Sequence, residues 1–209
     1  MINSLSELPA FCVNLDSRPD RWAAAQAEFA RVSWPVKRWP GVVYDTTPSL
    51  VVPKEHAGCL DSHRQLWRHC LDMQYPVMAV FEDDVVLASD FIDIFAAAVR
   101  ELPSDWALWH LHSSHAKTVP TGPRIVRVVS AMWGSHGYLL RPAACARLLS
   151  IPGYDTVDRR LSQGYLKAGG QPLGTALGSA LCFQRGDDSD IPKSAQLSFW
   201  RKQREQFWR

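Results

Sequence analysis

Three consecutive acidic residues follow an apolar segment in the middle of this sequence. Residues 77–81 read VMAVF, which is typical of a buried strand, and Glu82, Asp83 and Asp84 come directly after it. Carboxylates this close together repel one another unless a cation neutralises them, and oxygen ligands favour Mg²⁺ or Mn²⁺. The pattern therefore indicates a divalent-metal site at the end of a strand. The alternative is an acidic loop held by a nearby arginine.

The spacing within the triplet suggests which carboxylates act together. Side chains alternate between the two faces of a strand. If the chain stays extended through the triplet, Glu82 and Asp84 share one face and Asp83 points to the other. The sequence thus predicts that Glu82 and Asp84 form the working pair.

The composition is that of an ordinary globular protein. The 209 residues are 46% hydrophobic and 21% charged, which favours one domain, with or without a small appendage, over bulk disorder. Nine tryptophans indicate either a tryptophan-rich core or exposed stacking surfaces. The net charge of +2 does not by itself indicate nucleic-acid binding. Positive charge nevertheless gathers in residues 193–209, where five basic residues face one acidic residue.

The cysteines and the apolar segments bear on the compartment. The five cysteines are scattered and form no C-x-x-C pair, which favours reduced thiols over a disulfide framework or a zinc site. Residues 1–10 lack the features of a signal peptide, and no apolar run approaches the length of a membrane span. The sequence therefore predicts a cytoplasmic protein with no transmembrane segment.

Strand-like and helix-like segments alternate along the chain. Strands are expected at 11–15, 36–39, 77–81, 106–111, 124–129, 138–140 and 181–184, and helices at 22–32, 58–74, 91–102, 143–150, 157–167 and 198–208. Residues 42–57 and 112–123 are expected to be irregular, and 153–174 to be rich in turns around its short helix. This order predicts an α/β fold with a mostly parallel central sheet. Ligands bind such sheets at the carboxyl ends of strands, where the acidic triplet lies.

Six short segments, in order, resemble glycosyltransferase family 25, which includes bacterial lipopolysaccharide galactosyltransferases and collagen hydroxylysine galactosyltransferases. They are VNLDSRPDR at 13–21, GCLDSHR at 58–64, AVFEDDV at 79–85, GSHGY at 134–138, VD at 157–158, and Gln184 with SDI at 189–191. The resemblance implies a single GT-A-like domain, here assigned to residues 1–192, with a DxD-like metal motif. The helical spacing and positive charge of residues 193–209 predict a basic amphipathic helix after it. The resemblance also implies a nucleotide-sugar donor, in this family generally a UDP-sugar used with Mn²⁺.

The resemblance and the strand positions together suggest which residues bind the donor and the metal. Glu82 and Asp84 would hold Mn²⁺ or Mg²⁺ across the diphosphate, with Asp190 as a further ligand. Residues assigned to donor binding are Asn14, Arg18, Arg21, Ser62, His63, Asp83 and Gln184. The alternatives are surface arginines, a core histidine and a flexible acidic turn after the last strand.

An inverting transferase also needs a general base near the acceptor hydroxyl. Asp158 is the first candidate, Asp155 the second and His136 the third, and for each the alternative is a helix cap or a turn residue. Three histidines, His110, His112 and His115, suggest a metal cluster. The first two alternate on a strand-like run and the third lies beyond it, which favours a partly exposed structural or acceptor-side role over zinc binding.

The acceptor and the class of function stay open at this point. A surface glycan such as lipopolysaccharide is typical of the family, whereas the small size and basic aromatic tail suggest a hydroxylated DNA base by analogy. The helix expected within 193–209 either contacts nucleic acid or a membrane surface, or packs on its own domain. The competing classes are a non-enzymatic binding module and a metal-dependent phosphoryl-transfer domain, including a phosphorylated receiver.

Overall fold

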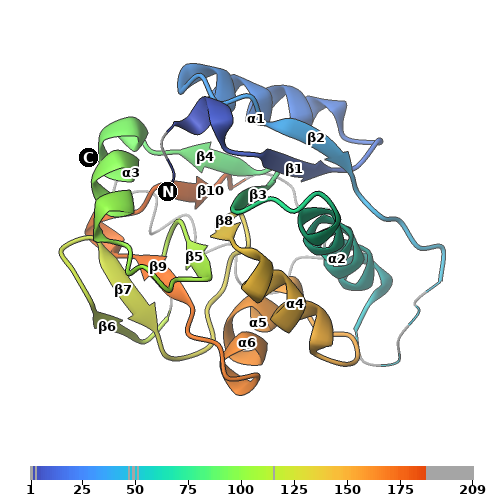
Figure 1. Cartoon of the computed structure of the whole chain (residues 1–209). Helices are drawn as coiled ribbons and strands as arrows, with labels where there is room; N and C mark the ends of the chain where they lie inside the picture. Colours follow the sequence, from blue (N-terminus) through green and yellow to red (C-terminus); the bar gives the residue numbers. More distant parts are fainter. Residues whose placement is uncertain are drawn as a thin grey trace.

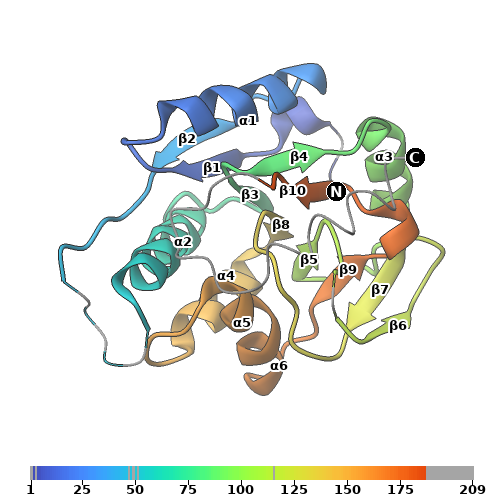
Figure 2. The ribbon, with the colours of Figure 1, turned by 180° about the vertical axis from the view of Figure 1, so that it is seen from behind.

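The fold is a central β-sheet with helices on both of its faces (Figures 1 and 2). The computed structural model describes residues 2, 4–46, 48, 50, 52–114 and 116–186. The expectations for Asp190 and for the segment 193–209 therefore lie outside the described residues.

The main sheet has eight strands, in the order β2-β1-β3-β8-β5-β9-β7-β6. The strands are β1 (Ala10–Asn14), β2 (Lys37–Pro40), β3 (Met78–Glu82), β5 (Leu108–His110), β6 (Thr118–Pro120), β7 (Ile125–Val128), β8 (Gly137–Leu140) and β9 (Leu173–Thr175). Only β8 and β7 run against the direction of the other strands. A separate antiparallel pair joins β4 (Val85–Leu87) to β10 (Cys182–Gln184). The predicted α/β class with a mostly parallel sheet is thus confirmed.

Helices cover both faces of the sheet because both faces are apolar. The helical elements are α1 (Pro19–Arg31), α2 (Lys54–Asp72), α3 (Phe91–Glu101), α4 (Pro142–Ser150), α5 (Val157–Arg159), a π-helical turn (Arg160–Gly164), α6 (Tyr165–Lys167), and 3₁₀ turns at Leu5–Glu7 and Leu177–Ser179. Strand β3 divides its side chains between two core clusters. Ala79 and Phe81 join the cluster that includes α1 and α3, and Met78 and Val80 join the cluster that includes α2 and α4.

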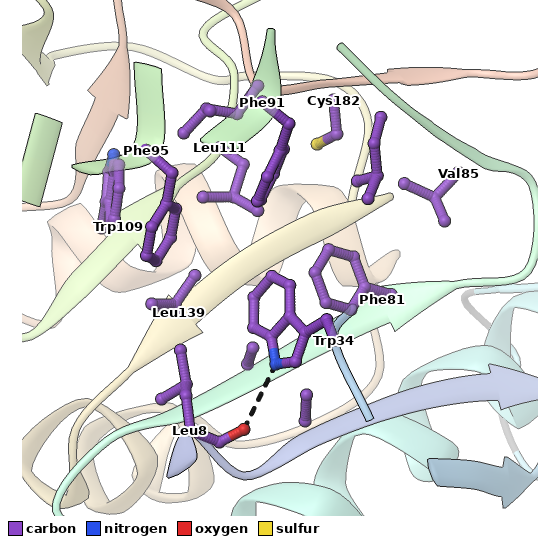
Figure 3. Packing of buried hydrophobic residues seen from close by; sticks show 14 of the residues in the cluster. Leu8, Trp34, Phe81, Val85, Phe91, Phe95, Trp109, Leu111, Leu139 and Cys182 are labelled. Carbon is purple, nitrogen blue, oxygen red and sulfur yellow. Dashed lines mark hydrogen bonds between the residues drawn. The ribbon is translucent and has the colours of Figure 1, made fainter. Parts of the chain in front are cut away.

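The first cluster contains much of the aromatic core (Figure 3). The Trp34 ring meets Phe81 edge-on, with ring centroids 5.2 Å apart, and its indole Nε1–H donates to the Leu8 carbonyl oxygen at 3.3 Å. Trp109 stacks on Phe95 at 5.5 Å. Four of the tryptophans in the described residues are buried, so the tryptophan content mainly serves the core.

Several elements differ from the predicted boundaries. Helix α2 begins at Lys54, four residues before the predicted start at Gly58. Strands β6 and β9 occupy segments predicted as a loop and as turns, and β4 follows the acidic triplet directly. Each of these strands has only three residues. Their conformation depends on pairing with distant strands, which a local sequence pattern does not report.

The topology brings four functional segments to one edge. Strands β1 and β3 are parallel neighbours, with Val13 opposite Glu82. The segments that follow these two strands therefore leave the sheet side by side. Strand β10 pairs with β4 and places Gln184 opposite Val85, beside the acidic triplet. Helix α1 follows β1 immediately, which returns its first turn to the same edge.

A candidate active site at the carboxyl ends of β1 and β3

The acidic triplet does not continue β3. The strand ends at Glu82, and residues 83–84 form a turn that leads into β4. Asp83 and Asp84 therefore approach the same guanidinium nitrogen of Arg21, with Nη2 2.7 Å from Asp83 Oδ1 and 3.1 Å from Asp84 Oδ2. The prediction that Asp83 points away from Asp84 was wrong, because the alternation of a strand does not hold through a turn.

Asp84 is buried beside a second negative charge. Gln184 Nε2–H donates to Asp84 Oδ2 at 2.8 Å, whereas the buried Oδ1 has no hydrogen-bond partner within the described part of the chain. Burial and, next, the negative charge of Glu82 raise the pKa of Asp84 to about 7, against the lowering effect of Arg21. Burial also raises the pKa of Asp83. The positive charge of Arg21 therefore does not offset the cost of burying Asp83 and Asp84.

Asn14 links the end of β1 to the triplet. Its Nδ2–H donates to Asp83 Oδ2 at 2.6 Å and to the Arg18 carbonyl oxygen at 2.9 Å. Its Oδ1 accepts from Arg38 Nε at 2.7 Å. The Arg18 side chain pairs with Asp20 at 3.0 Å, and Arg18 does not line the cavity described next. Arg21, with only 11% of its side chain exposed, is the arginine that reaches the carboxylates.

A cavity of about 330 Å³ opens over these residues. Its polar lining includes Asn14, Arg21, Ser62, Gln184 and the whole acidic triplet, and its apolar lining includes Val13, Leu15, Val42 and Val43. The volume lies within the range of small-molecule sites, roughly 300–1,000 Å³. A concave site with an apolar wall and converging charged groups is suited to a ligand that has both an aromatic ring and anionic groups.

Helix α2 holds the loop that forms the opposite wall. The Ser62 hydroxyl accepts from the Val42 backbone N–H at 2.8 Å and donates to the Gly58 carbonyl oxygen at 2.7 Å. A Cβ atom at Gly58 would lie 2.3 Å from the Val42 carbonyl oxygen, so only glycine permits this approach. Tyr44 donates its hydroxyl to Asp61 at 2.7 Å and fixes the far end of the loop. Gly58 and Ser62 thus shape the cavity wall.

Glu82 also contacts two polar residues that do not line the cavity, Ser135 and His63. The Ser135 hydroxyl donates a short hydrogen bond to Glu82 Oε1, and His63 Nε2 lies 3.5 Å from the same oxygen. Burial alone would raise the pKa of Glu82, but His63 and Ser135 lower it below its ordinary value. His63 Nδ1 lies 2.7 Å from the Tyr138 hydroxyl. His63 is therefore both a core histidine and a neighbour of the acidic triplet.

Asp158 is influenced by both Glu82 and Ser135. It was considered as a helix cap, but Thr156 fills that role by accepting from the Arg159 backbone N–H. Burial and then the charge of Glu82 raise the pKa of Asp158 to about 7, while the Ser135 hydroxyl and the Gly134 backbone lower it. Its buried Oδ1 finds no hydrogen-bond partner among the residues that the structure describes.

The other two candidate bases have different surroundings. His136 is buried and stacks on His112 with ring centroids 4.0 Å apart, and burial lowers the pKa of His136 to about 4. Asp155 accepts from the Thr156 backbone N–H at 2.8 Å and lies 3.5 Å from Arg159, in a local turn. His110 and His112 are buried, which corrects the expectation of partial exposure. His115, between them and β6 in the sequence, lies outside the described residues.

Sequence reasoning missed several residues of the site. Three of them, Ser135, Tyr138 and Cys59, lie inside the segments that resemble family 25. The family resemblance could therefore have marked them as site residues, although their residue types alone did not. Arg38 has no sequence signal, because its role depends on the parallel pairing of β2 with β1.

Comparisons with known proteins agree with the motifs. Residues 7–121 match glycosyltransferase family 25, described as an LPS biosynthesis protein family, and this chain belongs to that family. It is 26% identical to the lipooligosaccharide biosynthesis protein lex-1 of Haemophilus influenzae, over 49% of this chain and 38% of that protein. It is 27% identical to the lacto-N-neotetraose biosynthesis glycosyltransferase LgtB of Neisseria meningitidis, over 75% of this chain and 65% of that protein.

These matches have defined limits. The alignments cover less than two thirds of the length of either relative, and the family match ends before the segments at 134–138 and 157–158. Among the described helices, none is both long enough and apolar enough to cross a membrane. The resemblance to family 25 is confirmed, and the roles assigned to individual residues stay predictions.

Proposed function

We propose that this protein is a metal-dependent, inverting glycosyltransferase. It would move a sugar from a nucleotide-diphosphate donor, a UDP-sugar, to a hydroxyl group of a surface glycan such as lipopolysaccharide. One observation carries the proposal: in a chain of family 25, three carboxylates and Arg21 line a cavity at the carboxyl ends of β1 and β3. Family membership favours sugar transfer over phosphoryl transfer and over a binding module.

The acceptor is proposed from the relatives. Both are named for the biosynthesis of saccharides, lipooligosaccharide in one case and lacto-N-neotetraose in the other. The alternative of a hydroxylated DNA base depended on residues 193–209, which lie outside the described residues. A glycan hydroxyl is therefore the acceptor that the observations favour.

The residues of the triplet fit a divalent cation. Carboxylate oxygens are the ligands preferred by Mg²⁺ and Mn²⁺. Asp84 offers a buried oxygen without a hydrogen-bond partner in the described residues. Burial first, and then the charge of Glu82, raise the pKa of Asp84, and a cation would offset both effects. Glu82 and Asp84 are the proposed ligands. When bound, such an ion would act as a Lewis acid that stabilises the departing nucleotide diphosphate.

The remaining groups of the cavity can hold the donor. Arg21 is positioned to contact a phosphate oxygen, since its guanidinium already binds two anionic groups. The apolar wall formed by Leu15, Val42 and Val43 is suited to the face of a nucleobase. Asn14 and Gln184 orient Asp83 and Asp84 and offer further hydrogen bonds.

Asp158 is the proposed general base. A base works best when its pKa lies near the working pH, and the pKa of Asp158 is raised to about 7. Ser135 lies between Asp158 and Glu82 and can orient both carboxylates. The proton of the acceptor hydroxyl would pass to Asp158 as the hydroxyl oxygen forms a bond to the sugar carbon. The bond between that carbon and the diphosphate oxygen would break, and the nucleotide diphosphate would leave.

Donor binding tests the proposal directly. A ligand that binds only the folded state raises the melting temperature. We expect one UDP-sugar to raise the melting temperature in the presence of Mn²⁺, and the shift to be lost in Asp84→Asn but kept in Asp90→Asn, whose side chain is exposed and outside the cavity. The absence of a shift with every nucleotide-sugar, with and without Mn²⁺, would overturn the proposal.

The role of Asp158 needs a separate variant. Asp158→Asn should bind the donor as the wild type does, while transfer to a glycan acceptor slows by about 10²–10⁴-fold. Asp155→Asn is the matched control, because Asp155 lies three residues away in a local turn. Normal turnover in Asp158→Asn would remove this residue from the catalytic list.

A further inference from the structure

We propose that Cys59, His63 and Glu82 form a binding site for a borderline divalent cation such as Zn²⁺, distinct in chemistry from the proposed Mn²⁺ ligands. One ligand atom from each of the three side chains lies within 4.8 Å of the other two. Cys59 and Glu82 also line the cavity described above. The inference rests on residues of the proposed active site, because Glu82 is also a proposed Mn²⁺ ligand, but the test of the inference needs no nucleotide-sugar.

Two elements bring these side chains together. Cys59 and His63 are four residues apart in α2, so their side chains lie on the same face of the helix, one turn apart. Glu82 is the last residue of β3 and faces that helix across the end of the sheet. Local spacing did not indicate this site, because the three residues form no C-x-x-C motif and come from two separate elements.

His63 provides an independent indication of a ligand. The residue is fully buried, and its Nε2 has no hydrogen-bond partner in the described parts of the chain. This nitrogen lies 3.5 Å from Glu82 Oε1, too far for a good hydrogen bond. A buried nitrogen aimed at a carboxylate with a thiol beside it is the arrangement that a cation would complete.

The surroundings of His63 already orient its ring. Nδ1 lies 2.7 Å from the Tyr138 hydroxyl, which also accepts the Trp67 indole N–H at 3.0 Å. Histidine ligands of metal ions usually make such a hydrogen bond through the second ring nitrogen. With a cation on Nε2, the ring proton of His63 lies on Nδ1 and is donated to the Tyr138 oxygen.

The donor set selects the class of cation. One thiolate, one imidazole and one carboxylate favour Zn²⁺, whereas Mg²⁺ and Mn²⁺ favour oxygen ligands. Binding converts the Cys59 thiol to a thiolate, and its proton passes to solvent. Three protein ligands would leave a further position for water or an anionic oxygen, and two of the three residues, Cys59 and Glu82, line the cavity.

Cobalt is a suitable probe, since Co²⁺ occupies zinc sites and absorbs visible light. The 209-residue protein, freed of metal by a chelator, is titrated with Co²⁺ without any nucleotide-sugar. We expect one equivalent to produce a thiolate-to-cobalt charge-transfer band and strong four-coordinate visible bands, both removed by added Zn²⁺. Cys59→Ser should lose the charge-transfer band, and Glu82→Gln should weaken the visible bands.

Two controls separate this site from its surroundings. Cys70→Ser changes a buried cysteine on the same helix and should keep the full spectrum. Asp84→Asn should also keep it, although this variant loses the proposed Mn²⁺-dependent donor binding. Circular dichroism checks that each variant is folded. No thiolate band in the wild type, or a band that survives in a folded Cys59→Ser, would overturn the inference and leave the transferase proposal untouched.

Discussion

Replacing Asp84 by asparagine should make the metal-free protein more stable while removing its proposed metal-dependent function. The substitution keeps the size of the side chain, and the amide oxygen can still accept from Gln184. It removes a negative charge that is buried beside Glu82 and is only partly balanced by Arg21. Sites built for a ligand often carry such a cost to stability.

The raised pKa of Asp84 sets the magnitude. The pKa is about 7 in the folded protein, against an ordinary value of 3.8. Each tenfold change in proton affinity corresponds to about 1.4 kcal/mol, so ionised Asp84 lowers the free energy of unfolding by about 4 kcal/mol near pH 8. For a chain of this size, that corresponds to a rise of roughly 8–16 °C in the melting temperature of Asp84→Asn.

The pH dependence of stability provides a second test of whether ionised Asp84 destabilises the folded protein. Between about pH 4 and 7, folded Asp84 binds a proton that the unfolded chain has released, so the stability of the wild type falls as the pH rises. Asp84→Asn lacks this contribution. Urea unfolding of both proteins in the presence of a chelator should therefore give similar free energies near pH 4 and a clear advantage for the variant near pH 8.

Asp90→Asn provides the matched control, because Asp90 is exposed and its side chain caps no helix. It should follow the wild type across the whole pH range. If Asp84→Asn were less stable than the wild type at pH 8, or if the difference between them did not change with pH, the buried-charge reasoning would be refuted. The support for a cation at this position would then fall with it.

Two further substitutions test the neighbours of the triplet. Arg21→Gln should lower the free energy of unfolding at pH 8 by about 3–5 kcal/mol, because it leaves the buried carboxylates Asp83 and Asp84 without the guanidinium that pairs with them. Added Mn²⁺ should restore part of this loss. A loss below about 1 kcal/mol, the value typical of exposed ion pairs, would contradict the role given to Arg21. Arg127→Gln is the control, because Arg127 is exposed. Tyr138→Phe should cost about 1–3 kcal/mol in urea unfolding, because it deprives His63 and Trp67 of a buried partner; an unchanged stability would show that these hydrogen bonds contribute little.

The elements that carry the site were largely predictable from local patterns. The apolar run at 77–81 is a strand, the Ala-rich segment after Pro19 is a helix, and the predicted helices at 91–102 and 143–150 lie within one residue of their observed ends. The family-like segments also marked Asn14, Ser62 and Glu82, which all line the cavity. These predictions succeeded because burial of one face imposes a regular spacing on helices and strands.

The arrangement around the triplet was not predictable in the same way. Alternation suggested that Glu82 and Asp84 act together and that Asp83 does not, but the turn at 83–84 directs both aspartates to Arg21. The sequence allows Asp158 to be either a general base or a helix cap, and in the structure Thr156 caps the helix. Local sequence preferences for a turn or for one capping residue over its neighbour amount to small free-energy differences. Contacts with distant residues outweigh these differences.

The sequence by itself determined the α/β class, the family and the position of the acidic triplet at the end of a strand. Only the tertiary structure decided which distant groups meet the triplet. Gln184 reaches Asp84 across 100 residues of sequence, and His63 of α2 lies 3.5 Å from Glu82. Burial and then the charge of Glu82 raise the pKa of Asp158. The physical reason is that strand pairing and helix packing are set by burial over the whole chain, whereas sequence patterns report only the local part of that energy.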